Sequence, residues 1–295
     1  MGSLPLQLLV TGTMVGAIYG LIATGFVVIY KSAGVFNLAQ GQMVMLGGYV
    51  TLACLTQLNL PLLPALIVGS VAFVIIGVLI ERLMMRPLLG QSVLASVMMT
   101  IALQLVIGSI VMIVWGAKVT PFPKVFPQQP LFVGPLVISQ VGLWGFVISL
   151  LVFAVFTLFF KYSKLGMLMR ATAESHELAM SIGVDVKKVM RLSWMMGGVA
   201  ALLGGWIMAS TGSVGPQLAI VGLTALPVAI FAGLESILGC LIGGIIVGIA
   251  QNFAVGYLDR YTGGGLSDVT PYILMMLVLL VRPHGLFGMK KVERV

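Results

Sequence analysis

Charged residues are scarce in this sequence, and their scarcity excludes a soluble protein. Only 8% of the 295 residues are charged and 60% are hydrophobic, which gives a mean hydropathy of +1.15. A soluble domain carries about 25% charged residues, so a water-facing surface cannot be assembled from this composition. The sequence indicates an integral membrane protein in a lipid bilayer, and its 37 glycines suit helices that pack closely in lipid.

Signals of catalysis, metal binding and disulfide formation are also missing. No lysine follows a glycine, which excludes the phosphate-binding loop G-x-x-x-x-G-K-[ST]. Cys54 and Cys240 both lie in apolar runs, which argues against a disulfide framework. The stretch HELAM begins like a zinc-protease H-E-x-x-H motif at His176, but Met180 stands in place of the second histidine. We expect no enzymatic activity, no metal and no cofactor bound by this chain.

Long stretches without charge predict many membrane-spanning helices. Each is long enough for one or more helices of about 20 residues, and helices satisfy the backbone in lipid. The sequence predicts an all-α membrane protein, a single transmembrane domain over residues 1–295, with eight to nine spans that include one or two broken or re-entrant segments. The expected spans are 5–30, 36–57, 61–81, 93–115, 139–160, 191–211, 218–234, 236–257 and 268–282.

The distribution of basic residues predicts the orientation of the chain. A net charge of +8 would suggest a nucleic-acid partner in a soluble protein, but here the basic residues lie between spans, and we expect no such partner. The loop 82–86, the segment 161–191 and the tail 289–295 are basic, so all three are expected in the cytoplasm. The N-terminus is then outside, the C-terminus cytoplasmic, and the proline-rich loop 116–138 extracytoplasmic and non-helical.

Two predicted spans are interrupted by polar or helix-breaking residues. Asn37, Gln40 and Gln42 lie among small residues, and Thr224 and Pro227 lie in a later apolar run. Broken helices at membrane depth occur inside protein or along a water-filled path, so these residues are candidates for a translocation pathway. Simple kinked spans joined by hydrogen bonds between helices remain the alternative.

Other residues in the spans predict packing rather than transport. Gln104, Gln251 and Asn252 are weaker pathway candidates that fit packing contacts better. Four glycines spaced for one small-residue helix face predict close helix packing. These glycines are Gly239, Gly243, Gly244 and Gly248.

The segment 161–191 is the most polar part of the chain and is patterned as a helix. Over 165–183 small apolar residues recur at three- and four-residue steps, and Arg170, Glu174 and Glu177 occupy the other face. Gly183 is a helix stop and Asp185 an N-cap for the next helix. The helix is solvated, lies in the lipid interface or docks on a partner protein, and composition does not choose among the three.

The chain therefore reads as a pathway without its own energy source. Intramembrane acid or histidine relays, which proton-coupled transporters use, are missing, since Glu235 is the only acid in a long apolar run and falls at a turn. A transporter of this kind needs an external energy source, and a docking helix in the polar segment would connect it to that source. A stand-alone secondary transporter or facilitator, or a membrane scaffold subunit, are the alternatives.

Four stretches, in order along the chain, resemble the permeases of the LivH/LivM family of ATP-binding-cassette importers, named for branched-chain amino acid uptake. They are IYKSAGVFNLAQGQMVMLGGYV (29–50), LGMLMRATAESHELAMSIGVDVKKVMRLSWMMGGVAALLGG (165–205), GLTALPVAIFAGLESILGCLIGG (222–244) and VLLVRPHGLFG (278–288). The short chain, which ends soon after the last stretch, is more similar to the LivH type than to the LivM type.

The resemblance implies partners and a coupling site. It implies a second, LivM-like permease, two cytoplasmic ATPase subunits that bind ATP and magnesium, and a periplasmic or lipid-anchored binding protein, all at a bacterial or archaeal cytoplasmic membrane. It also implies that 165–183 is a coupling helix whose movement gives alternating access. The implied coupling residues are Gly166, Arg170, Ala171, Glu174, Glu177, Ala179 and Gly183.

The resemblance also implies a substrate class. Branched-chain or other hydrophobic amino acids are expected, with related amide or urea-type solutes as further members of the class. This expectation rests on the family and on no recognition residue in the sequence.

Overall fold

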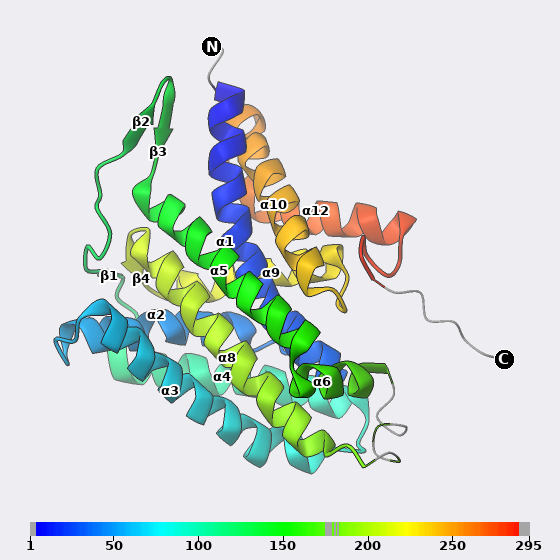
Figure 1. The fold of residues 1–295 in the computed structure, drawn as a ribbon. Helices are drawn as coiled ribbons and strands as arrows, with labels where there is room; N and C mark the ends of the chain where they lie inside the picture. Colours follow the sequence, from blue (N-terminus) through cyan, green and yellow to red (C-terminus); the bar gives the residue numbers. More distant parts are fainter. Residues whose placement is uncertain (1–3, 175–178, 180, 182, 289–295) are drawn as a thin grey trace.

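A computed structural model describes residues 4–174, 179, 181 and 183–288 and is built almost wholly of helices (Figure 1). Six helical stretches are long and apolar enough to cross a membrane: Leu4–Ala33, Leu62–Leu88, Val93–Trp115, Gln140–Tyr162, Val186–Ser210 and Ile237–Thr262. The chain is thus a multi-pass, all-helical membrane protein.

The elements follow one another in this order. They are α1 (Leu4–Ala33), α2 (Gln40–Thr56), α3 (Leu62–Ile80), the π-turn Glu81–Met85, the 3₁₀ turn Arg86–Leu88, α4 (Val93–Trp115), β1 (Thr120–Pro121), β2 (Leu131–Val133), β3 (Leu136–Ile138), α5 (Gln140–Tyr162), α6 (Lys164–Glu174), α8 (Val186–Ser210), β4 (Ser213–Val214), α9 (Gln217–Ala232), α10 (Ile237–Phe253), the π-turn Ala254–Leu258, α11 (Asp259–Thr262) and α12 (Leu266–Val281).

Several helices begin at a side-chain cap. Ser92, Ser139 and Ser236 accept a hydrogen bond from the first turn of α4, α5 and α10. Asp185 does the same for α8, with Lys188 N as donor at 3.2 Å, so the predicted N-cap is confirmed. Caps of this kind satisfy amide groups that have no partner within the helix.

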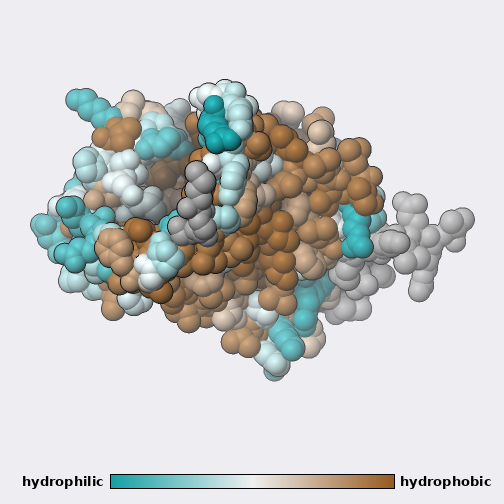
Figure 2. Space-filling model, turned by 90° about the horizontal axis from the view of Figure 1, so that it is seen from above, coloured by the Kyte–Doolittle hydropathy of each residue, from teal (hydrophilic) through white to brown (hydrophobic). Residues whose placement is uncertain are grey.

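Helix α1 is the centre of the bundle (Figure 1). In its most apolar stretch 89% of the residues are buried, because α10, α8, α5 and α9 all pack against it. The corresponding share is 28% for α3, 22% for α4 and 28% for α5, so these helices carry much of the outer surface. Figure 2 shows the result, a broad hydrophobic surface over the middle of the molecule with hydrophilic residues towards its edges.

Helices α1 and α10 run antiparallel in backbone contact. A Cβ placed on Gly16 would lie 2.4 Å from the carbonyl oxygen of Gly244, and one on Gly248 would lie 2.5 Å from that of Gly12. A Cβ on Gly20 would lie 2.7 Å from the oxygen of Cys240. Glycines four residues apart on both helices therefore interlock, and no side chain fits between them.

The loop 116–138 and helix α6, which begins the polar segment 161–191, lie at opposite ends of the bundle. Gln7, at the start of α1, exchanges hydrogen bonds of 2.6 and 3.0 Å with the backbone of Val137 in the loop 116–138. At the other end of α1, Lys31 Nζ donates to the carbonyl of Glu235 at 3.0 Å, and α6 packs nearby (Figure 1). The loop 116–138 contains no helix, as predicted.

The loop 116–138 is anchored on the turn between α8 and α9. Strand β1 pairs antiparallel with β4, and Phe126 lies 5.7 Å, centroid to centroid, from Trp206 of α8. Strands β2 and β3 form a separate hairpin beside the N-terminus of α1 (Figure 1). One part of this loop therefore belongs to the core, and the hairpin projects from it.

Three helices are shorter than a full span. Helices α2, α9 and α12 have 17, 16 and 16 residues, and a 16-residue helix is about 24 Å long against about 30 Å of hydrocarbon. Helix α2 begins only at Gln40, because residues 34–39 form a turn. Helix α9 runs through Pro227 without a break and ends at Gly233, whose φ of +98° suits glycine.

Replacing Gly16 by alanine should destabilise the protein by about 1–3 kcal/mol, because the added methyl group meets the backbone of α10 and the two helices must move apart. The thermal unfolding midpoint of the detergent-purified protein measures this. Gly212→Ala is the matched control, since a Cβ there meets no atom within 4 Å. Equal midpoints for the two variants would contradict the proposed contact.

Candidate translocation and coupling sites

A groove runs between α2 and α4 on the outer side of the bundle. Its volume is about 550 Å³, and Pro216, just before α9, also lines it. Helix α2 contributes Gln42 and Met45, and α4 contributes the rest. The lining residues from α4 are Gln104, Leu105, Gly108, Ser109, Met112 and Ile113.

Gln42 reaches this groove, whereas its neighbour Gln40 does not. Residues two apart on a helix point in nearly opposite directions. The Oε1 atom of Gln42 is buried and, within the described part of the chain, has no hydrogen-bond partner. A Cβ on Gly108 would lie 3.4 Å from that oxygen, so the glycine of α4 leaves room for the amide.

Asn37 and Gln40 lie in the interior and hold the turn between α1 and α2. Asn37 Nδ2 donates to Gln40 Oε1 at 2.9 Å, and Gln40 Nε2 donates to the carbonyl of Gly197 in α8 at 3.2 Å. The Asn37 oxygen accepts from the amide of Ala39. Both side chains are fully buried, and the network satisfies polar groups that would otherwise be stranded.

Thr224 and Pro227 are buried on α9, behind α2 as seen from the groove. Thr224 Oγ1 donates to the carbonyl of Ile220 within its own helix at 3.0 Å. Helices α2 and α9 cross where Gly41 meets Gly222: a Cβ on Gly222 would lie 2.7 Å from the Cα of Gly41. The five predicted pathway residues thus converge on α2 and its neighbours, but Gln42 alone among them lines the groove.

The coupling segment begins with a tight corner between α5 and α6. Ser163 Oγ accepts from Gly166 N at 2.8 Å, and a Cβ on Gly166 would lie 2.5 Å from the carbonyl oxygen of Phe159. Met169 is fully buried, whereas Arg170 is exposed and Ala171 lies between these extremes. Helix α6 therefore rests on α5, α1 and α8 by one face and presents Arg170 on another.

The remaining coupling residues lie further along this segment. Glu174 is the last residue of α6, Ala179 is buried, and Gly183 has a φ of +84°, as suits the predicted helix stop. Glu177 lies outside the described residues. Hydrogen bonds from the backbone N–H and side chain of Lys188 hold the pKa of Asp185 below its usual value.

A buried ion cluster, which the sequence did not predict, joins α8 to the end of α3. Glu81 is fully buried in the π-turn, and both its oxygens accept from Arg86 at 3.0 Å. Arg191 Nε, on the second turn of α8, lies 3.4 Å from the same carboxylate. An acid at the end of an apolar run, followed by an arginine, was the available signal. The cluster ties α8, directly after the coupling segment, to the membrane bundle.

The segment 282–288 closes the C-terminal end of α9. Leu286 N donates to the carbonyl of Phe231 at 3.0 Å, and Phe287 N to that of Ala232 at 2.9 Å. These carbonyls belong to the last turn of α9, which has no partners within the helix. Gly285, with a φ of +76°, lies against Gly233.

The predicted packing glycines of α10 fall on two faces. Gly244 and Gly248 lie against α1, whereas Gly243 faces α9, where a Cβ would lie 3.0 Å from that of Ala232. Gly239 lies beside its own N-cap, Ser236. Of the other amides, Gln251 donates to Ser267 O of α12 at 2.6 Å, and the Asn252 oxygen accepts from Thr11 Oγ1 of α1 at 3.2 Å, so both join α10 to a neighbouring helix.

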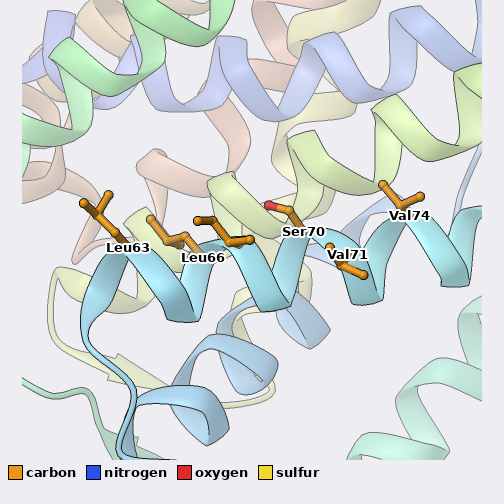
Figure 3. Close-up of a pocket in the computed structure, with 6 residues that line it drawn as sticks. Leu63, Leu66, Ser70, Val71 and Val74 are labelled. Atoms are coloured by element: carbon orange, nitrogen blue, oxygen red, sulfur yellow. The ribbon is translucent and has the colours of Figure 1, made fainter.

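A second groove, along α3, is apolar and has a volume of about 360 Å³ (Figure 3). Helix α3 alone supplies its lining, which is aliphatic except for Ser70. It is therefore part of the lipid-compatible surface rather than a site formed between elements. Among the described residues, no cluster of three His, Cys, Asp or Glu side chains could hold a metal.

Comparison with known proteins identifies relatives over nearly the whole chain. A family described as branched-chain amino acid transport system, permease component, matches residues 8–280. The chain is 31% identical to the high-affinity branched-chain amino acid transport system permease protein BraD of Pseudomonas aeruginosa, over 98% of both chains. It is 29% identical to the corresponding protein LivH of Escherichia coli, over 98% of this chain and 97% of that one. A probable branched-chain amino acid transport permease of Methanocaldococcus jannaschii is 30% identical, over 93% and 90%.

Replacing Glu81 by glutamine should lower the thermal unfolding midpoint by several degrees, because two guanidinium groups lose their buried counter-ion and the bidentate contact is broken. Glu235→Gln, the same chemical change at the same end of the bundle, is the control and should leave the midpoint almost unchanged. Equal shifts would mean that the cluster contributes nothing specific.

Proposed function

Because this chain belongs to the family of branched-chain amino acid transport system permease components, we propose that it carries branched-chain or other hydrophobic amino acids across a bacterial or archaeal cytoplasmic membrane. Related amide or urea-type solutes belong to the same proposal. The observation that carries it is the extent of the family match, from residue 8 in α1 to residue 280 in α12. As an ABC permease subunit the chain is not an enzyme.

The partners follow from the role of a permease component. A permease of an ABC transport system works with ATPase and binding-protein partners. In our proposal these are two cytoplasmic ATPases that bind ATP and magnesium, a second LivM-like permease, and a periplasmic or lipid-anchored binding protein. Energy then enters from outside the chain, in keeping with the absence of proton relays from its sequence.

The proposed orientation has the N-terminus outside and the C-terminus in the cytoplasm. The basic residues Lys161, Lys164 and Arg170 lie at the α6 end of the bundle, which supports a cytoplasmic position for that end. Six helical stretches are long enough to cross the membrane, and our proposal of eight to nine spans requires that two or three of the short helices α2, α9 and α12 cross it as well.

The proposed coupling site is α6 and the segment that follows it. Arg170 is exposed there, while Met169 on a neighbouring face of the helix is fully buried. A force applied to α6 by an ATPase would pass into α5, α1 and α8, which α6 contacts. The ion cluster of Glu81 would carry part of that movement from α8 into α3.

The proposed pathway follows α2. Gln42 lies on the groove, Asn37 and Gln40 fix the depth at which α2 starts, and Thr224 and Pro227 belong to the helix behind it. Of these residues, only Gln42 needs to contact the solute. The other four residues set the position of α2, and α2 must move when the transporter switches from outward to inward access.

Purification of the tagged chain in mild detergent from its own membranes, followed by mass spectrometry and uptake assays in liposomes, tests the function. We expect two ATPases and a second permease to copurify, and ATP-dependent uptake of leucine once the binding protein is added. A chain that emerges alone and moves solute without ATP would instead be a facilitator, and the proposal would fail.

Arg170→Glu should detach or uncouple the ATPases, because it reverses the charge of the exposed face of α6. We expect ATP-driven leucine uptake to fall by about tenfold or more, as for loss of a charge-assisted contact. Lys118→Glu makes the same change at the opposite end of the bundle and should retain the ATPases. Full ATPase binding and uptake in the Arg170 variant would assign this residue to solvated surface.

Phe132→Asp should weaken docking of the binding protein without affecting ATPase attachment. Phe132 is 74% exposed on the β2–β3 hairpin, at the end of the bundle away from α6. Exposed aromatic residues contribute strongly to protein interfaces, and a charge there would disrupt one. Surface plasmon resonance between the complex and its binding protein measures this, and an unchanged affinity would move the docking surface elsewhere.

A further inference from the structure

We propose that the groove between α2 and α4 is a subsite for net-neutral, zwitterionic amino acids with small aliphatic side chains. This inference rests on the proposed function, since it names the place and the selectivity within the same pathway. Six residues carry the argument: Gln42, Met45, Gln104, Gly108, Ser109 and Met112, all of which line the groove.

The polar side chains of the groove lack partners. Gln42 Oε1 is buried without a hydrogen bond, and neither Gln104 nor Ser109 is hydrogen-bonded to any residue that the structure describes. An amide or hydroxyl group placed in an apolar environment without a partner costs several kcal/mol on hydrocarbon scales. Lipid chains therefore do not suit this groove, and water, solute or another polar surface must meet it.

The shape of the groove follows from α4. Gln104, Gly108 and Met112 recur every fourth residue and share one face, with Ser109 beside them. The missing side chain at Gly108 leaves room for the Gln42 amide against α4. A volume of about 550 Å³ lies within the usual range for small-molecule sites, about 300–1,000 Å³.

The lining indicates the charge class of the ligand. Two amides and a hydroxyl offer donors to a carboxylate and acceptors to an ammonium group, which are the two ends of a zwitterion. No charged residue lines the groove, so an additional charge on the ligand side chain would enter without a counter-ion. Met45 and Met112 offer a flexible apolar surface that adapts to aliphatic side chains of different shape.

The open side of the groove requires a cover. Leu105 and Ile113 flank it on α4 and are 66% and 83% exposed, so none of the described residues covers this side of α4. In the proposed transporter the second permease supplies the facing wall. Substrate then passes between the two subunits with Gln42, Gln104 and Ser109 on one side of it.

The first test is uptake by the complete reconstituted transporter, with permeases, ATPases and binding protein. Gln42→Leu and Gln104→Leu should each reduce leucine uptake by about tenfold, the effect of one lost hydrogen bond to a charged group. Gly108→Val should reduce it at least as much, by filling the space before Gln42. Gln57→Leu, at the exposed end of α2, is the matched control and should transport normally.

Selectivity gives a second readout. In the wild-type transporter, excess valine should compete with leucine for permease-limited uptake, whereas lysine and glutamate should not. Gln42→Glu places a carboxylate in the groove without changing its size. We expect it to depress leucine uptake, while complex composition and unfolding midpoint stay at wild-type values.

Cysteine labelling tests whether the groove holds water and substrate. Ser109→Cys should react with a membrane-impermeant, charged thiol reagent, because thiolate forms only where water reaches it, and leucine should slow the reaction during turnover. Ile110→Cys, exposed on the same helix but outside the groove, should not react. The native cysteines are both buried.

Three results would overturn the inference. Normal leucine uptake in all three groove variants would remove the groove from the pathway. Loss of the second permease from the Gln42→Leu complex would make these polar groups subunit contacts instead. An unreactive Ser109→Cys would mean that lipid or protein seals the groove. Failure of the wild-type transporter to take up any neutral amino acid would contradict the proposed function itself. That result is distinguishable from the other three, which concern only the groove.

Discussion

The close contact of α1 with α10 determines where the rest of the bundle can lie. Carbonyl oxygens of one helix occupy the space that side chains would fill on the other, with Gly12, Gly16 and Gly20 facing Cys240, Gly244 and Gly248. Water supplies little driving force for this association within lipid, so dispersion between closely packed backbones must supply it. Because α1 is enclosed on its other sides by α8, α5 and α9, an error in its position would be passed on to each of them.

A second constraint is that the polar groups at a helix end inside the membrane need hydrogen-bond partners. The turn 34–39 satisfies its polar groups through Asn37 and Gln40, and the last carbonyls of α9 are met by Leu286 and Phe287. In both places the chain provides its own partners. Gln42, Gln104 and Ser109 differ, since no described residue is hydrogen-bonded to their side chains, and in our proposal the solute is their partner.

The features that could be predicted from the sequence are those that depend on charge content and on local backbone geometry. The scarcity of charge gave the membrane class, the prolines of 116–138 gave a non-helical loop, and Asp185 was identified as a cap. It did not predict pairings between distant segments. Arg191 reaches Glu81 only because α8 packs beside α3, and the glycines of α10 did not reveal that α1 is their partner. Gln40 and Gln42 are chemically alike, and only their positions around α2 separate an interior bond from a groove wall.

The C-terminal closure of α9 has a consequence for biosynthesis. Phe231 and Ala232 leave the ribosome well before Leu286 and Phe287, which complete their hydrogen bonding. Until α12 and the segment after it have been synthesised, the last carbonyl groups of α9 lack these hydrogen-bond partners. Insertion of the nascent chain therefore proceeds with the end of α9 incomplete, although α1, α2 and α10 already pack against that helix.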